Sequence, residues 1–294
     1  ASLAALAALA AVAAAPAVRA ALVRAPVPIA IGAKTFTEQY ILSRVVAGRI
    51  AHATGLPTRA VDSLGSTVAF DALRAGELDA YVDYSGTLYT TVLGHDGAGA
   101  ERAAVLRAVT QELAARDGVV VAAALGFENT YALALRRADA ERLGVRTISD
   151  LFAHAGALRL AGDYELFGRP EWRSVEQRYG AAAFAERRSM DPSLLYEAAR
   201  TGQVDVISAF STDGRIVAYD LTVLVDDRHA IPPYDAVVLV SARLARAHPE
   251  VVQALRALAG TIDAGRMRRL NAAVDDGKRA PAAVADALLR ELGL

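Results

Sequence analysis

The stretch IAIGAKTFTEQ, residues 29–39, decides the fold of this chain. It predicts a short buried strand and a turn, followed by a helix over residues 37–54 with Lys34 at its mouth. Thr35 and Glu38 have the spacing of a capping box, in which each side chain satisfies a backbone donor of the other. A lysine at a strand end beside a helix N-terminus is well placed to bind an anion, although an exposed loop lysine is the alternative. One face of the helix carries the apolar residues Ile41, Leu42, Val45, Val46 and Ile50, and Gly55 ends it.

The composition indicates two lobes and excludes several functions. A chain of 294 residues is long for one hydrophobic core. The net charge of −1 does not suggest nucleic acid or an anionic membrane surface as a partner. Cysteine is absent, which excludes disulfides, thiolate metal sites, cysteine nucleophiles and a lipid-modified N-terminal cysteine.

The first residues have the composition of a secretory leader. Residues 1–20 form an apolar run that ends in small residues, with Val18-Arg19-Ala20 as a cleavage signal. We therefore predict a signal-peptide-like leader over residues 1–25. The alternative is a short membrane anchor, but Pro16 breaks a stretch that is only weakly hydrophobic.

Beyond the leader, strand-like and helix-like segments alternate, which is typical of an α/β protein with mainly parallel sheets. The predicted strands lie at 28–31, 58–61, 79–82, 119–123, 130–135, 158–161, 204–209, 221–225 and 236–240. The main predicted helices lie at 37–54, up to 75, 101–116, 171–179, 193–200, 242–259 and 281–292.

One segment is echoed later in the chain. Residues 72–85 and 198–211 both give a helix end, a glycine, an aspartate, a buried strand and an aromatic-serine pair. The two copies suggest two similar lobes that face each other. Ligands of open α/β sheets gather at the carboxyl ends of strands, where Tyr84 and Phe210 fall.

The sequence offers few candidates for catalytic or metal-binding residues. The five histidines are scattered without ligand spacing, and HExxH, GxSxG and Walker A motifs are absent. Asp226-Asp227 resembles half a metal site, but an acidic pair after a strand is usually a solvated turn. Gly65-Ser66-Thr67 opens a helix, and its backbone donors suit a carboxylate. We expect no catalytic residue, no metal and no cofactor.

The polar and aromatic residues that remain suit a small zwitterion. Basic and hydroxyl groups in loop-like positions would bind a carboxylate. Aromatic faces would bind a cation whose charge is too diffuse for hydrogen bonding. The anion donors are Lys34, Thr67 and Arg169, and the aromatics are Tyr131, Phe210 and Tyr234.

A set of sequence blocks, in order along residues 28–294, carries a resemblance to one family. The blocks are GAKTFTEQYIL (32–42), GELDAYVDYSGT (76–87), NTYAL (129–133), FSTDGR (210–215), DDRH (226–229) and PPYD (232–235). Together they resemble the substrate-binding proteins of osmoprotectant ABC importers, which carry glycine betaine, carnitine or choline.

The resemblance implies a two-lobe periplasmic-binding-protein fold (type II-like) with the ligand in the interlobe cleft. Lobe one would hold residues 27–125 plus 231–294, and lobe two residues 126–230. The two hinge crossings would lie near 125–130 and 226–232.

The resemblance also implies roles for individual residues. Lys34, Thr67 and Arg169 match the positions that bind the ligand carboxylate, and Tyr131, Phe210 and Tyr234 match an aromatic box for the trimethylammonium group. Three cleft-lining positions depart from the pattern: Leu64 replaces a box tyrosine, position 210 is Phe rather than Tyr, and Asn129 replaces an aspartate. A lost aromatic wall removes about 0.5–2 kcal/mol of cation–π attraction.

We therefore predict a monomeric periplasmic solute-binding protein for a glycine betaine-type ligand. It would deliver the ligand to a permease that works with its ATPase in the inner membrane. The first alternative keeps the fold and binds choline, ergothioneine or another cationic zwitterion. More remote alternatives are an enzyme on the same fold and the effector domain of a transcription regulator, which would need an N-terminal DNA-binding helix-turn-helix.

Overall fold

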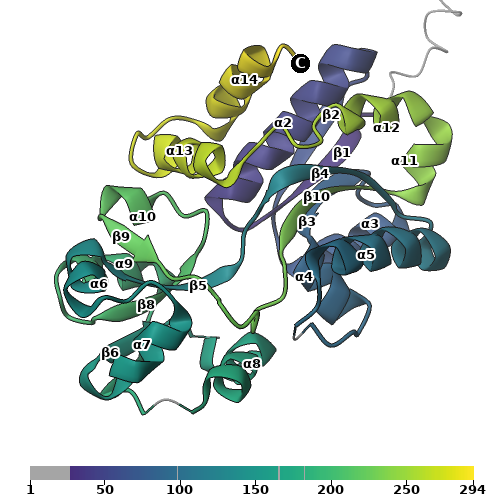
Figure 1. Cartoon of the computed structure of the whole chain (residues 1–294). Helices are drawn as coiled ribbons and strands as arrows, with labels where there is room; N and C mark the ends of the chain where they lie inside the picture. The colour runs from purple at the N-terminus through teal and green to yellow at the C-terminus, as the bar shows by residue number, and fades with distance from the viewer. Residues whose placement is uncertain (1–26, 98, 165, 182) are drawn as a thin grey trace, which may run out of the picture.

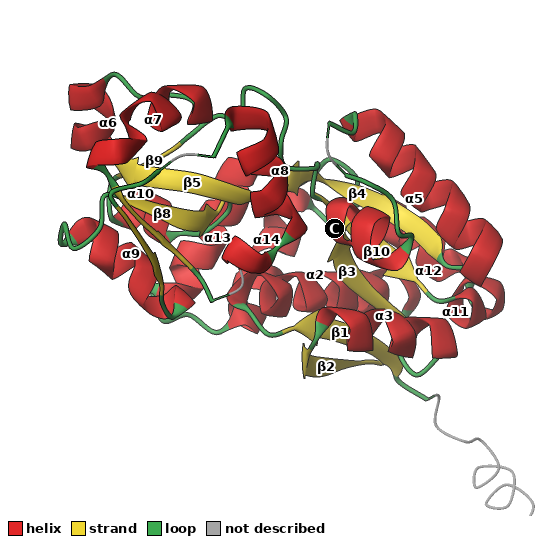
Figure 2. Ribbon diagram, turned by 90° about the horizontal axis from the view of Figure 1, so that it is seen from below, coloured by secondary structure: helices red, strands yellow, loops and turns green. Residues whose placement is uncertain are grey.

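A computed structural model describes residues 27–97, 99–164, 166–181 and 183–294, and the predicted leader lies outside them. The chain forms two lobes, each built on its own sheet with helices on both faces (Figures 1 and 2). Among the described residues, none of the helices is long and apolar enough to cross a membrane.

The first lobe contains a sheet of strand order β2-β1-β3-β10-β4. Its strands are β1 (Ile29–Lys34), β2 (Thr58–Leu64), β3 (Ala80–Tyr84), β4 (Val120–Glu128) and β10 (Asp235–Val240). Its longer helices are α2 (Thr37–Thr54), α3 (Ser66–Ala75), α5 (Arg102–Asp117), α11 (Ala242–Ala247), α12 (Pro249–Arg256), α13 (Ala264–Asp275) and α14 (Pro281–Leu292). The short helix α4 (Ser85–Thr87) and the π-helix η1 (Leu88–Val92) follow β3.

The second lobe contains a sheet of strand order β7-β6-β8-β5-β9. Its strands are β5 (Tyr131–Arg136), β6 (Arg159–Gly162), β7 (Glu186–Ser189), β8 (Val206–Phe210) and β9 (Leu221–Val223). Its helices are α6 (Arg137–Leu143), α7 (Ile148–His154), α8 (Pro170–Tyr179), α9 (Pro192–Arg200) and α10 (Arg215–Ala218), with 3₁₀ turns η2 (Ala155–Ala157) and η3 (Leu166–Gly168).

Each sheet has one reversed strand. In the first sheet β10 pairs antiparallel with both β3 and β4, while β1 pairs parallel with β2 and β3. In the second sheet β5 pairs antiparallel with β8 and β9, while β6 pairs parallel with β7 and β8. The reversed strands are those by which the chain enters a lobe from the other one. The expectation of mainly parallel sheets therefore holds for strand direction but fails for the pairs made by these two strands.

Helix α2 confirms the predicted span and apolar face but not the predicted cap. All five predicted apolar residues are buried in the first lobe's core, and Gly55 ends the helix in the left-handed conformation with φ 71°. The helix begins after Phe36, which makes no side-chain cap hydrogen bond. The capping box of Thr35 and Glu38 is therefore wrong, because the Glu38 carboxylate turns into the protein to meet donors from other segments.

Several other elements also differ from the predicted pattern. The predicted helix 242–259 is interrupted at His248, because Pro249 starts a new helix. Helix α13 and strand β7 were not predicted. Figure 1 shows α13 between α2 of the first lobe and α10 of the second.

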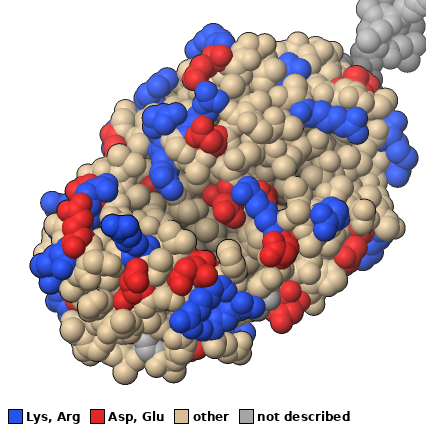
Figure 3. All heavy atoms as spheres, in the orientation of Figure 1, with Lys and Arg blue, Asp and Glu red and all other residues tan. Residues whose placement is uncertain are grey.

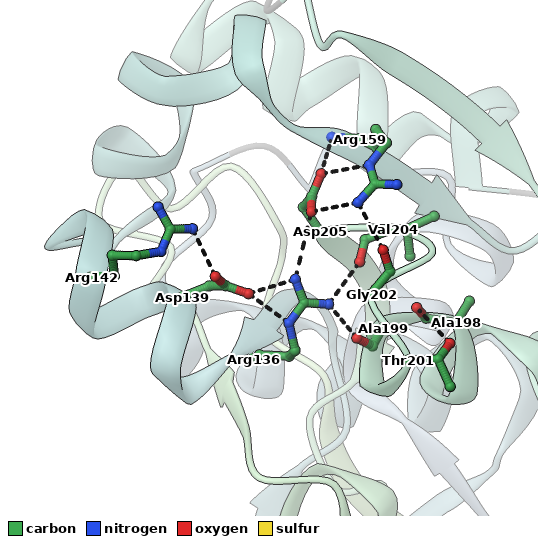
Figure 4. Close-up of polar contacts among 10 residues, drawn as sticks. All are labelled: Arg136, Asp139, Arg142, Arg159, Ala198, Ala199, Thr201, Gly202, Val204 and Asp205. Carbon is green, nitrogen blue, oxygen red and sulfur yellow. Dashed lines mark hydrogen bonds and ion pairs between the residues drawn. The ribbon is translucent and has the colours of Figure 1, made fainter.

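The two echoed segments perform the same structural task in each lobe. The Asp79 carboxylate accepts a hydrogen bond from the Ala30 backbone N–H at 2.9 Å, which fixes the start of β1. The Asp205 carboxylate accepts one from the Arg159 N–H at 2.9 Å, which fixes the start of β6. In the second lobe the Arg159 and Arg136 guanidinium groups extend this contact into the ion-pair network of Figure 4.

The serine that ends each echoed segment fastens a crossing between the lobes. Ser85 Oγ accepts from the Asp235 N–H at 2.9 Å, and Ser211 Oγ accepts from the Thr130 N–H at 3.1 Å. Each hydroxyl also donates to a backbone carbonyl of the same crossing. The aromatic residues Tyr84 and Phe210 directly precede these serines, so the fold places both beside the two segments by which the chain crosses between the lobes.

Candidate functional site

A cavity of about 460 Å³ lies between the lobes and is lined by residues of both. Six of the eight predicted site residues line it: Lys34, Asn129, Tyr131, Arg169, Phe210 and Tyr234. The surrounding surface carries no field of one sign, since basic and acidic side chains are interspersed on the face seen in Figure 3.

Thr67 and Leu64 lie elsewhere in the first lobe. Thr67 is exposed and lines an adjoining hollow of about 410 Å³. Ser66 and Thr87 line both spaces, so the two are neighbours. Leu64 is half-buried and packs against an apolar cluster of the first lobe.

Lys34 is buried at the end of β1 and forms an ion pair with Asp83 of β3. Asp83 also accepts hydrogen bonds from the Tyr81 hydroxyl at 2.6 Å and from the Tyr84 N–H at 2.7 Å. The Lys34 ammonium stands 5.4 Å from the centroid of the Tyr84 ring. Sequence reasoning missed Asp83, although a carboxylate within a buried strand signals a need for a partner of opposite charge.

Arg169 belongs to a second charged group on the other side of the cavity. It precedes α8 and contacts the Glu171 carboxylate through two N–O distances of 3.2 Å. The Tyr234 hydroxyl, from the first lobe, donates to the same carboxylate. Burial opposes ionisation of Glu171, but the hydrogen bonds from Arg169 and Tyr234 outweigh it and lower the pKa of Glu171. This contact joins the two lobes.

The predicted aromatic residues form one wall of the cavity. Tyr131 of β5 and Phe210 of β8 are paired across the second sheet, with ring centroids 4.9 Å apart. The Arg169 guanidinium lies 5.1 Å from the centroid of the Tyr131 ring, which shows that this face accepts a cation. Tyr234 is buried and also lines the cavity, and its hydroxyl donates to the Glu171 carboxylate.

Glu38 lines the cavity, and its contacts differ from the capping box that the sequence predicted. Its carboxylate accepts from the Tyr84 hydroxyl at 2.6 Å, from Asn129 Nδ2 at 3.0 Å and from Asn271 Nδ2 at 3.2 Å. The Thr212 side chain also favours the charged form of this carboxylate. Burial raises the pKa of Glu38 above its ordinary value, against the lowering effect of these donors. Within the described residues, both asparagine Oδ1 atoms have no hydrogen-bond partner, because their amide N–H groups face Glu38.

The cavity offers charges of both signs but no metal site. Acidic and basic side chains line it side by side: Glu38, Asp163, Asp213 and Asp275 with Lys34, Arg169 and Arg215. In the part of the chain that the structure describes, no group of three histidine, aspartate or glutamate residues could hold a metal ion. Asp226, from the acidic pair that resembled half a metal site, accepts hydrogen bonds from the backbone N–H groups of Ala230 and Ile231 in the second crossing.

Known sequences of one family match most of the chain. Residues 27–291 match the family of the substrate binding domain of ABC-type glycine betaine transport system. A glycine-betaine-binding protein of Pseudomonas aeruginosa is 34% identical over 90% of this chain and 87% of its own length. The carnitine transport binding protein OpuCC of Listeria monocytogenes is 32% identical over 90% of this chain and 86% of its own length.

Solved structures share the architecture. A glycine betaine/carnitine/choline ABC transporter structure superposes with a TM-score of 0.83 at 33% identity, over 90% of this chain and 98% of that one. Apo YehZ from Escherichia coli gives a TM-score of 0.74 at 24% identity, over 90% of this chain and 99% of that one. These similarities confirm the predicted two-lobe periplasmic-binding-protein fold.

Proposed function

We propose, since the chain belongs to the family of substrate-binding domains of ABC-type glycine betaine transport systems, that it binds a quaternary ammonium zwitterion in the interlobe cavity. Glycine betaine and carnitine, which its relatives are named for, represent this class. The closed, ligand-loaded protein would then deliver the ligand to a permease.

The observation that carries this proposal is the convergence of opposite recognition chemistries in one cavity. Lys34 and Arg169 come from different lobes and offer cations to a carboxylate. Tyr131 and Phe210 offer aromatic faces to a cation that cannot donate hydrogen bonds. A small molecule with a carboxylate at one end and a trimethylammonium group at the other meets both requirements.

We assign the residues accordingly. Lys34 and Arg169 bind the carboxylate, and Thr67 joins them from the adjoining hollow, which shares Ser66 with the cavity. The aromatic box consists of Tyr131, Phe210 and Tyr234. Binding requires no reaction at the ligand, so this function assigns no catalytic residue.

Closure of the lobes is the proposed transport signal. A ligand that contacts Lys34 on one lobe and Arg169 on the other stabilises the closed form over the open one. We place lobe one at residues 27–125 with 231–294 and lobe two at 126–230. The two separate sheets support two lobes, and β4 of the first sheet runs three residues past the first boundary, to Glu128. The proposed site of action is the periplasm, after removal of the leader, with the protein a monomer and the permease coupled to an ATPase in the inner membrane.

Isothermal calorimetry with glycine betaine tests the proposal, with a thermal-shift screen of carnitine, choline, proline betaine and ergothioneine beside it. Ligand binding raises the stability of the folded state as RT ln(1 + [L]/Kd), so weak ligands register at high concentration. We expect Lys34→Ala and Arg169→Ala to weaken carboxylate ligands more than choline. Absence of heat and of any thermal shift at millimolar ligand would refute the quaternary ammonium assignment.

A further inference from the structure

The two lobes contribute aromatic rings to the cavity unequally. Among the described residues, those of the first lobe that line it with a ring are Phe36, Tyr84 and Tyr234. Tyr84 and Tyr234 are each only 5% exposed, and their hydroxyl groups donate to the carboxylates of Glu38 and Glu171. Phe36 is 39% exposed, so it is the most accessible of the three rings.

Leu64 leaves the first lobe without a box tyrosine. It stands at the position where the family resemblance implies that tyrosine, and it packs against an apolar cluster of the first lobe, outside the cavity lining. A leucine has no ring quadrupole with which to attract a cation. The assigned box therefore takes Tyr131 and Phe210 from the second lobe but only the buried Tyr234 from the first. An accessible ring of the first lobe would complete it.

Phe36 stands close to the proposed carboxylate site. Its ring stacks on that of Tyr84, with centroids 6.3 Å apart and 24° between the ring planes. The Lys34 ammonium lies 5.4 Å from the centroid of the same Tyr84 ring. In glycine betaine a single methylene group separates the carboxylate from the ammonium. A carboxylate at Lys34 therefore keeps the cation near the rings that surround Tyr84.

The backbone fixes Phe36 at the junction of β1 and α2. Its N–H donates to the Lys34 carbonyl at 3.0 Å, and its carbonyl accepts from the Gln39 N–H at 3.0 Å. Phe36 is also the N-cap residue of α2, in an extended conformation. The position of the ring is thus set by the same turn that positions Lys34.

We propose that Phe36 is a specificity-determining residue of the binding site: its ring gives the quaternary ammonium group an aromatic face from the first lobe, in place of the tyrosine that Leu64 replaces. This inference rests on the proposed function, because it needs a cation in the cavity. A ring that acts by cation–π attraction discriminates by the charge of the ligand, whereas apolar packing does not. The two roles therefore differ for an uncharged ligand of the same shape.

Isothermal calorimetry with matched ligand pairs tests the inference. Glycine betaine is compared with tert-butylacetate, in which carbon replaces the ammonium nitrogen, and choline with its own tert-butyl analogue. Phe36→Leu removes the ring but keeps an apolar side chain, and Phe36→Tyr keeps the ring. Tyr40→Leu is the matched control, because Tyr40 lies one turn further along α2, outside the cavity lining, where its hydroxyl contacts Ser63 Oγ at 3.2 Å.

The expected signature is a loss of affinity that depends on charge. Phe36→Leu should weaken glycine betaine and choline by about threefold to tenfold, the range of one cation–π contact in a partly desolvated site. The affinities of the tert-butyl analogues should stay within about twofold of the wild type. Phe36→Tyr and Tyr40→Leu should stay within about twofold for every ligand.

Each other result has a defined meaning. An equal loss for a charged ligand and its tert-butyl analogue in Phe36→Leu would show a packing role and overturn the inference, and so would an equal loss in Tyr40→Leu. Where the wild type binds no analogue, a loss in Phe36→Tyr as large as that in Phe36→Leu overturns it.

The wild type separates this inference from the proposed function. Unchanged affinities in Phe36→Leu, with a wild type that binds glycine betaine or choline, would overturn the role of Phe36 and leave the proposed function intact. A wild type that binds neither ligand would overturn both. Thermal unfolding shows whether Phe36→Leu is folded, and Phe36→Met, tested with the same ligands, is the second variant if it is not.

Discussion

Removal of the Lys34 charge should destabilise the protein by about 3 kcal/mol, because it strands a buried carboxylate. The side chains of Lys34 and Asp83 are 6% and 1% exposed, so water cannot replace the lost counterion. Breaking a buried pair by removal of one partner costs about 3–5 kcal/mol. Asp83 keeps its hydrogen bonds from Tyr81 and Tyr84, which places the expected loss at the lower end, about 3 kcal/mol.

Urea unfolding of Lys34→Met, followed by far-UV circular dichroism, measures this loss. Arg44→Met is the matched control, because Arg44 pairs with Asp62 on the surface of the same lobe, where the side chains are 27% and 39% exposed. An exposed pair contributes about 0–1 kcal/mol. The double variant Lys34→Met/Asp83→Asn removes both charges and should recover most of the lost stability.

Two results would refute this reasoning. A loss below about 1 kcal/mol in Lys34→Met would mean that the pair behaves like a surface ion pair. A double variant as unstable as Lys34→Met would mean that the stranded charge is not the cause. In either case the buried ion pair would not be the source of the stability that Lys34 contributes.

Three further predictions concern pH and packing. Because burial raises the pKa of Glu38, the folded state binds the proton of the Glu38 carboxyl group more tightly than the unfolded chain does. The wild type should therefore lose stability relative to Glu38→Gln as pH rises from about 4.5 through the raised pKa. The pKa of Glu171 is lowered, so its contribution should be full above about 4.5 and should vanish on acidification, which closes the gap between wild type and Glu171→Gln. Melting temperatures between pH 3 and 8, on the order of the range in which carboxyl groups titrate, check both signs. Gly214→Ala should cost about 1–3 kcal/mol by contact with α13, whereas Gly168→Ala, which meets nothing within 4 Å, should stay within about 0.5 kcal/mol in urea unfolding.

The sequence was sufficient where structure depends on neighbours along the chain. The period of α2, its glycine end and the strand β1 before it follow from local patterns, and the structure has them at nearly the predicted residues. The echo of Asp79 and Asp205 was also readable, because the same task at the start of a parallel strand selects the same residue in both lobes.

The sequence was insufficient where a side chain has two possible partners. Thr35 and Glu38 have capping-box spacing whether Glu38 turns back to the backbone or inward. The inward donors, Asn129 and Asn271, are 91 and 233 residues away, so no local pattern contains them. A buried carboxylate with several donors is decided by tertiary packing alone.

Helix α13 was missed for a different reason. Its sequence, AGRMRRLNAAVD, has no continuous apolar stripe, since one of its buried side chains is the polar Asn271. The readable signal was the N-cap Asp263, whose carboxylate accepts from the Arg266 N–H at 2.6 Å. The omission mattered, because α13 supplies Asn271 and Asp275 to the cavity.

The position of the two crossings between the lobes suggests an order of events in the proposed binding reaction. Tyr84 and Phe210 stand next to the serines that fasten the two crossings, so rotation of one lobe moves them little. Lys34 and Arg169 stand on different lobes, so rotation changes their separation more. We therefore expect the ammonium end of a ligand to bind first, at the preformed aromatic wall. The carboxylate then draws the two lobes together, because only the closed form lets both cations reach it.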